Sequence, residues 1–159
     1  MITRLLSIAK RREKTALSEL SRQKAVVDQA STHVEQCRQL LADFQQWWPE
    51  EENRLFSQLC TDLRTSKDID DFQATLAKLQ QLENDRATKL ASAKVELENQ
   101  QQLLLQSRNH YQHTRKKLEK FQQLQTREQD EARIYEATMQ ELEQEDRPFG
   151  NANDENFLP

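Results

Sequence analysis

Apolar residues recur at alternating steps of three and four along two long stretches of this sequence. The second stretch runs from Ile69 to Leu142 in a single frame for more than ten heptads, and 15 of its 22 seam positions are apolar. These 15 are Ile69, Phe72, Leu76, Leu79, Leu90, Ala93, Leu97, Leu104, Tyr111, Leu118, Phe121, Ala132, Tyr135, Met139 and Leu142. A mean spacing of 3.5 residues is typical of a helix whose narrow apolar seam packs against another helix. We therefore predict one long helix that has a partner.

The first stretch shows the same spacing from Leu6 to Trp48. Eleven of its 13 seam positions are apolar or Cys: Leu6, Ala9, Ala16, Leu20, Val27, Ala30, Val34, Cys37, Leu41, Phe44 and Trp48. Pro49 follows directly, and proline inside a helix removes a hydrogen bond and clashes with the preceding turn. We expect a kink or a short break near residues 48–49, after which the helix resumes in a shifted frame through Leu55, Phe56, Leu59 and Leu63.

A turn is predicted at residues 64–68. Thr65 or Ser66 can cap a new helix, and Thr65 has capping-box spacing with Asp68. Short connections join antiparallel neighbours. The predicted fold is all-α: a long antiparallel two-helix coiled-coil hairpin with a first arm over 1–64, a turn over 65–68, a second arm over 69–145 and a disordered tail over 146–159.

The charge distribution agrees with a chain that folds back on itself. Residues 1–24 contain seven Lys or Arg and two Glu, whereas residues 127–159 contain ten Asp or Glu and three Arg. We expect the basic start of the first arm to lie beside the acidic end of the second. Because the seam then closes within one chain, the protein is expected to be a monomer.

The composition is typical of long helices. There is one Gly, 31% of residues are charged, and the mean hydropathy is −1.00. No apolar run is long enough to span a membrane, and the apolar N-terminal stretch is too short for a signal peptide. We expect a cytoplasmic protein without membrane insertion, in which Cys37 and Cys60 are free thiols.

The sequence offers no catalytic, cofactor or metal site. His110 and His113 share a helical face but lack a third ligand, and Glu50-Glu51-Glu52 is explained by the positive end of a helix dipole after Pro49. An enzyme is not expected, and no cofactor is expected. The basic cluster of Arg4, Lys10, Arg11, Arg12 and Lys14 lacks interleaved aromatic residues in a chain of net charge −4. A protein surface of opposite charge fits this cluster better than nucleic acid.

Four aromatic residues lie in the third of the chain nearest the turn: Phe44, Trp47, Phe56 and Phe72. Many apolar residues beside the seam only widen the buried stripe. Trp47 stands apart because it adjoins a seam position without occupying one. Aromatic side chains dominate protein-binding hot spots, so these four residues are candidates for a partner site.

At these positions the sequence resembles a known family. The segments Trp47-x-x-Glu50-Glu51-Glu52-x-Arg54-Leu55-Phe56, Lys67-Asp68-Ile69-x-x-Phe72-Gln73-x-x-Leu76-Ala77 and the opening Met1-Ile2-x-Arg4-Leu5 resemble the type III secretion stalk proteins of the YscO family, which are similar to flagellar FliJ. The likeness covers nearly the whole chain.

The resemblance implies a cytoplasmic stalk at the cytoplasmic face of a type III secretion apparatus. It implies a helical hairpin that links the hexameric export ATPase to the cytoplasmic domain of the export gate, and some members also bind secretion chaperones. On this basis Arg4, Lys10, Arg11, Arg12 and Lys14 are expected to bind the ATPase. Phe44, Trp47, Phe56, Phe72 and Leu76 are expected to bind the gate. The alternatives are a coiled-coil adaptor or chaperone-like hairpin unrelated to secretion, and a self-associating structural rod.

Overall fold

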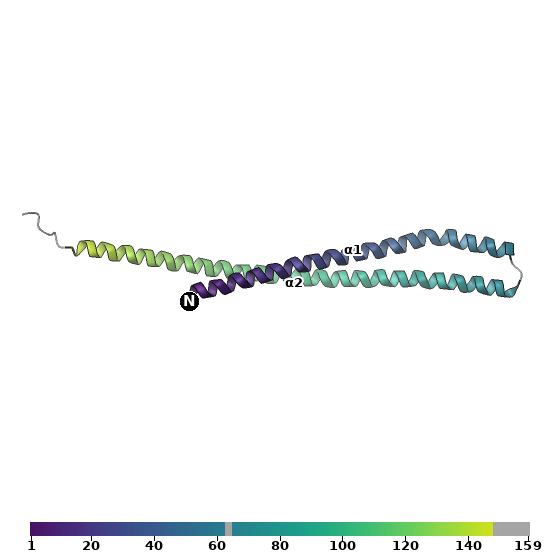
Figure 1. Cartoon of the computed structure of the whole chain (residues 1–159), viewed down its shortest axis with the longest axis horizontal. Coiled ribbons are helices and arrows are strands. Elements are labelled where there is room, and N and C mark those ends of the chain that lie inside the picture. The colour runs from purple at the N-terminus through teal and green to yellow at the C-terminus, as the bar shows by residue number, and fades with distance from the viewer. Residues whose placement is uncertain (63–64, 148–159) are drawn as a thin grey trace, which may run out of the picture. The chain divides into compact units, whose positions relative to one another are not determined.

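The computed structural model describes residues 1–62 and 65–147, and two long α-helices account for nearly all of them. Helix α1 is Ile2–Asp62 and helix α2 is Ser66–Glu145 (Figure 1). The described residues contain no strand. The fold is the predicted all-α helical hairpin.

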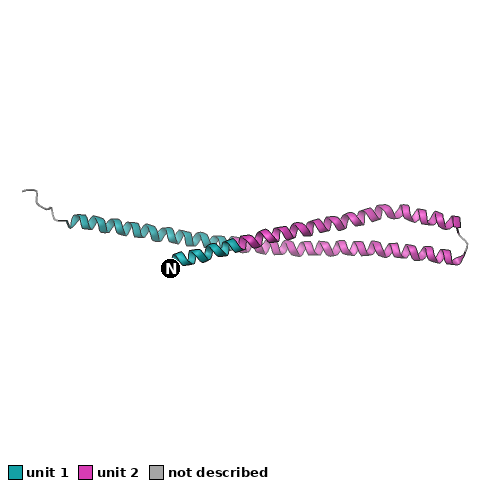
Figure 2. Cartoon of the chain, in the orientation of Figure 1, with its two compact units in different colours: residues 1–15, 112–159 teal, residues 16–111 magenta. Residues whose placement is uncertain are grey.

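The chain divides into two compact units (Figure 2). Unit 1 comprises Met1–Thr15 of the first arm and the chain from Gln112 onward, and unit 2 comprises Ala16–Tyr111. Each unit pairs a segment of α1 with an antiparallel segment of α2.

The two predicted seams are the buried faces of the helices. All 13 positions from Leu6 to Trp48 on α1 are buried or half-buried. On α2 the 16 successive seam positions from Phe72 to Gln125 are buried or half-buried as well. Small side chains such as Ala9 and Ala16 in α1 and Ala93 in α2 are among the most buried residues, which lets the two backbones approach closely. The local 3.5-residue spacing therefore located the packing interface.

The α2 seam is shorter than the apolar pattern. Every residue from 126 to 145 is exposed, including the seam residues Ala132, Tyr135, Met139 and Leu142. In unit 1, α2 continues past the N-terminus of α1, so this stretch has no α1 segment to pack against (Figure 2). We call residues 126–145 the overhang.

Pro49 lies inside α1, which runs through it without a break. The seam also keeps its frame there, because Trp48, Glu51 and Leu55 are half-buried in steps of three and four. The expected frame shift comes later: Leu59 is half-buried and Phe56 is exposed. Of the two alternatives at this proline, a break is therefore excluded. Leu63, which was expected in the shifted frame, lies outside the described residues.

The start of α2 shows one half of the predicted capping box, the bond to the Asp68 side chain, together with a backbone turn bond. The Thr65 backbone N–H donates to Asp68 Oδ2 at 2.9 Å, and the Asp68 N–H donates to the Thr65 carbonyl at 3.1 Å. Thr65 is thus the N-cap and Asp68 the third helical residue, so the second helix begins at Ser66. The predicted tail falls outside the described residues except for Asp146 and Arg147.

Candidate functional site

An aromatic cluster in unit 2 is centred on Phe44, a seam residue that is only 4% exposed. The Phe44 ring lies 5.6 Å from the Trp47 ring and 5.5 Å from the Trp48 ring, measured between centroids. Trp47 is 42% exposed. Phe44 therefore offers almost no surface to a partner and instead supports Trp47, which does.

Arg86 of α2 completes this cluster from the facing helix. Its guanidinium carbon lies 4.9 Å from the centre of the Phe44 ring, and its Nη1 donates to the Leu40 carbonyl oxygen at 3.1 Å. The cation attracts the electron-rich ring face, and the hydrogen bond fixes its position. Sequence reasoning missed this contact. The sequence signal was that Arg86 is a charged residue at a seam position of α2, but which α1 residue it contacts required the structure.

A second aromatic pair lies nearer the turn. The rings of Phe56 and Phe72 are 6.4 Å apart and tilted, and Phe56 is 57% exposed while Phe72 and Leu76 are half-buried seam residues. A shallow groove beside the pair is lined by Leu55, Leu59 and Phe72, with carboxylates of Asp62 and Asp71 at its margin. The four predicted aromatic residues thus form two pairs on unit 2, and the exposed member of each pair is on α1. We call Trp47, Phe56, Phe72 and Leu76 the aromatic surface.

The predicted basic cluster lies on the α1 segment of unit 1. Arg4, Lys10, Arg11, Arg12 and Lys14 are all exposed. At Arg12 the expected acidic neighbour is replaced by a basic one, because Arg12 lines the same groove as Lys117 of α2. The α2 segment that pairs with α1 here contains Arg115, Lys116, Lys117 and Lys120. The prediction that the basic start of the first arm lies beside the acidic end of the second is therefore wrong. The acidic residues belong to the overhang, which extends past the N-terminus of α1.

The groove between these two basic segments is apolar inside. It has a volume of about 170 Å³ and is lined by Leu5, Ile8, Ala9, Arg12, Thr114, Lys117 and Phe121. Leu5 and Ile8 are exposed and Phe121 is half-buried. We call this the basic groove. A weak signal for this groove is visible in the sequence, since Leu5 and Ile8 both lie beside seam positions of the first arm.

The acidic run after Pro49 has local structural partners. The Trp48 Nε1–H donates to Glu52 Oε2 at 3.0 Å, and Arg54 Nε donates to Glu51 Oε2 at 2.9 Å. The hydrogen bonds from Arg54 hold the pKa of the Glu51 carboxyl below its ordinary value. Across the described chain, no three His, Cys, Asp or Glu side chains are placed to hold a metal ion.

Cys37 and Cys60 are both free cysteines, as predicted. Cys37 is buried in the seam against Val34 and Ala93, and its Sγ lies 3.7 Å from His33 Nε2. Cys60 is exposed. Cys37 thus contributes to the packing of unit 2 as a small apolar side chain.

Comparison with known proteins identifies the family. The family model of the type III secretion protein YscO matches residues 2–148. The chain belongs to the YscO family. It is also similar to the crystal structure of the type III secretion protein YscO from Vibrio parahaemolyticus, at 32% sequence identity over 91% of each chain and a TM-score of 0.82. No curated protein sequence matches it.

Membership of the YscO family assigns the chain to type III secretion, as the resemblance predicted. The fold agrees with this assignment, because the YscO crystal structure has the same helical hairpin. Neither described helix is long and apolar enough to cross a membrane.

Proposed function

We propose that this YscO family member is a non-enzymatic stalk that couples the hexameric export ATPase to the cytoplasmic domain of the export gate, at the cytoplasmic face of the apparatus. The observation that supports this most strongly is the presence of two chemically different surfaces on the same pair of helices. The aromatic surface belongs to unit 2, and the basic cluster belongs to unit 1. Two unlike surfaces suit two unlike partners.

The aromatic surface is the proposed site for the gate. Trp47 and Phe56 are the exposed anchors, and large aromatic side chains contribute most to binding when a partner desolvates them. The Phe44 ring packs against Trp47 and is itself held by Arg86, so little conformational entropy is lost when a partner binds Trp47. Phe72 and Leu76 extend the apolar area toward the turn.

The basic cluster is the proposed site for the ATPase. Arg4, Lys10, Arg11, Arg12 and Lys14 are all solvent-exposed. Exposed cations of this kind steer association with an acidic surface and make binding depend on ionic strength. A single hairpin serves one ATPase ring in this proposal.

A stalk needs helices that transmit displacement rather than a cavity that binds substrate. Helix α1 is continuous from Ile2 to Asp62 despite Pro49, and the α2 seam is occupied from Phe72 to Gln125. A packed two-helix seam resists bending more than either helix alone. The groove beside the Phe56–Phe72 pair is shallow and open, which fits docking of a protein surface better than catalysis.

The gate assignment is tested with Trp47→Ala combined with Phe56→Ala. Both side chains are exposed, so the fold is retained, and binding to the purified gate domain in calorimetry is expected to weaken at least about tenfold. Leu40→Ala is the matched control, because Leu40 is a similarly exposed apolar residue of α1. Unchanged affinity and normal secretion in the double variant would remove the gate assignment.

The ATPase assignment is tested with Arg11→Glu combined with Arg12→Glu. ATPase binding is expected to fall, and binding of the unaltered protein is expected to weaken steeply with added salt. Arg22→Glu with Lys24→Glu is the control, since both residues are exposed on the same helix but belong to unit 2. Equal loss in the control, or binding that does not respond to salt, would contradict the assignment.

A further inference from the structure

Unit 1 is divided into two stretches of opposite charge. Its paired part, residues 2–15 and 112–125, contains nine Lys or Arg and two Glu, a net charge of +7. The overhang contains two Arg and seven Asp or Glu, a net charge of −5. The fold thus brings cations of α1 and α2 together, although like charges repel, and leaves the compensating anions on a helix without a partner.

Both stretches also carry exposed apolar side chains between their charged residues. The basic groove exposes Leu5 and Ile8, and Leu124 lies one helical turn beyond Phe121 with its side chain still exposed. The overhang exposes Tyr135, Met139 and Leu142 in the heptad frame, with Tyr135 67% exposed. A sustained apolar stripe on a polar helix is the pattern of a helix that packs against another.

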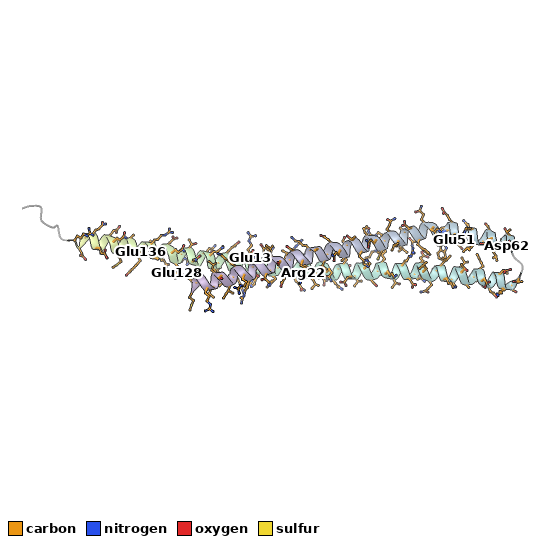
Figure 3. The ribbon with its side chains drawn as sticks, in the orientation of Figure 1. Glu13, Arg22, Glu51, Asp62, Glu128 and Glu136 are labelled. Carbon is orange, nitrogen blue, oxygen red and sulfur yellow. The ribbon has the colours of Figure 1, made fainter. Side chains whose placement is uncertain are left out.

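Acidic residues border the apolar stripe of the overhang. Glu128 lies in the heptad frame itself, and helical spacing places Glu131 on one side of the stripe and Glu136 and Glu143 on the other. Figure 3 labels Glu128 and Glu136 on this part of α2. Arg12 and Lys117 line the basic groove, and Lys120 follows Lys117 by three residues on the same side of α2. The stripe and the groove are therefore complementary in both charge and apolarity.

We propose that the occupant of the basic groove is the overhang of a second copy of this chain. The two chains pack through unit 1 in antiparallel orientation about a two-fold axis. Such an interface is isologous, so each overhang fills the groove of the other chain and every contact is made twice.

The overhang cannot occupy the basic groove of its own chain. Helix α2 is uninterrupted from Ser66 to Glu145, so the overhang continues away from its own groove and cannot fold back onto it. The seam of each hairpin stays closed within its own chain, which distinguishes this dimer from a rod in which two chains share one seam. The two-fold arrangement also separates the like charges of the two overhangs by placing each beside a basic surface.

The dimer would cover Arg12, one of the basic residues that the proposed function assigns to the ATPase. If that assignment holds, the free protein is a dimer and the ATPase competes with the second copy for the basic cluster. This consequence rests on the proposed function, whereas the dimer rests only on unit 1.

The test is sedimentation velocity of the purified full-length chain over a range of concentration and salt. A monomer–dimer equilibrium is expected that shifts toward monomer as salt rises. Two variants probe the two surfaces: Arg12→Glu with Lys117→Glu in the groove, and Glu136→Lys with Glu143→Lys in the overhang. Each is expected to raise the dimer dissociation constant by about tenfold or more, because every reversal acts twice in a two-fold interface.

Mixing the two variants decides between this interface and general charge effects. The groove variant then presents an acidic groove to a basic overhang, and the overhang variant presents a basic groove to an acidic overhang. The mixture is expected to form a heterodimer while each variant alone is monomeric. Lys78→Glu with Lys94→Glu, two exposed residues of unit 2, is the matched control and should dimerise like the unaltered chain.

Three results would overturn the proposal. The first is a monomer at every concentration and salt, which would leave the groove to an acidic helix of another protein. The second is a dimer that the groove and overhang variants do not weaken. The third is a mixture in which the two variants stay monomeric.

Discussion

Gln23 and Gln100 hydrogen bond across the seam of unit 2, although they are 77 residues apart in the sequence. The Gln23 side-chain amide donates to Gln100 Oε1 at 2.8 Å and to the Gln100 carbonyl oxygen at 3.1 Å. Gln100 in turn donates to Glu96 Oε1 at 2.7 Å. A satisfied polar pair within an apolar seam favours one alignment of the two helices, since a slipped register would leave both amides half-buried without partners.

Replacing one partner of this pair is expected to cost more than replacing both. Gln23→Leu leaves Gln100 Oε1 without its donor and should lower the free energy of unfolding by about 1 kcal/mol. Gln23→Leu with Gln100→Leu should recover that loss, because two leucines pack in the seam. Urea denaturation followed by circular dichroism measures both, and a double variant less stable than the single one would contradict the register role.

Arg86→Ala is expected to destabilise the hairpin through the Phe44 cluster. The change removes the cation over the Phe44 ring and the hydrogen bond to Leu40, a combined loss of about 1–2 kcal/mol. It should also increase the exposure of Trp47, seen as a red shift of tryptophan fluorescence. Lys89→Ala, an exposed change one turn further along α2, is the control. Equal stability of the two variants would show that Arg86 does not support the cluster.

Pro49→Ala is expected to stabilise α1. Proline in a helix interior costs up to about 3 kcal/mol relative to alanine, and Pro49 lies within an uninterrupted helix whose seam frame is unchanged there. The melting temperature should therefore rise. A lower melting temperature would mean that the proline is needed for the packing of Trp48 and Glu51.

The Glu51–Arg54 pair predicts a specific pH response. Because hydrogen bonds from Arg54 lower the pKa of Glu51 in the folded state, its contribution to stability is present above the unfolded pKa and is lost as pH falls through the folded one. Carboxyl chemical shifts should show Glu51 titrating at higher pH in Arg54→Gln than in the unaltered chain. An unchanged Glu51 midpoint would contradict the assignment.

The helices and their packing faces could be read from the sequence because both depend on local spacing. The 3.5-residue repeat alone predicts the buried positions from Leu6 to Trp48 on α1 and from Phe72 to Gln125 on α2. The end of the α2 seam could not be read this way. Tyr135 and Met139 keep the repeat but are exposed, because burial depends on the length of the facing helix, which the repeat on α2 does not encode.

The predicted pairing of the basic start of the chain with its acidic end was wrong for a related reason. Averaged over long stretches, the two ends of the chain have opposite sign, but register is set by the seam and not by net charge. The seam places Arg12 beside Lys117, whose charge the comparison of residues 1–24 with 127–159 had left out. Exposed ion pairs contribute too little to override apolar packing.

The aromatic residues of the candidate site could be named from the sequence, but not all of their contacts and exposures. Phe44 occupies a seam position and is buried, whereas Trp47 and Phe56 lie off the seam and are exposed. Spacing alone distinguishes Phe44 from Trp47, whereas Phe56, which was expected in the shifted frame after Pro49, is exposed. Arg86 required the structure, since its role depends on which α1 residue lies opposite it.

The most direct test of the account is the distance between spin labels on the two arms of unit 2. Lys24→Cys and Gln101→Cys, exposed neighbours of the Gln23–Gln100 pair, are labelled in a chain with Cys37→Ala and Cys60→Ser and diluted with unlabelled protein. Pulsed dipolar spectroscopy should give a single distance below about 30 Å, set by packed helices roughly 8–10 Å apart plus the label arms. An undoubled helix would separate the labels by roughly 115 Å at about 1.5 Å per residue. A missing short distance, or one that disappears on dilution, would contradict a hairpin closed within a single chain.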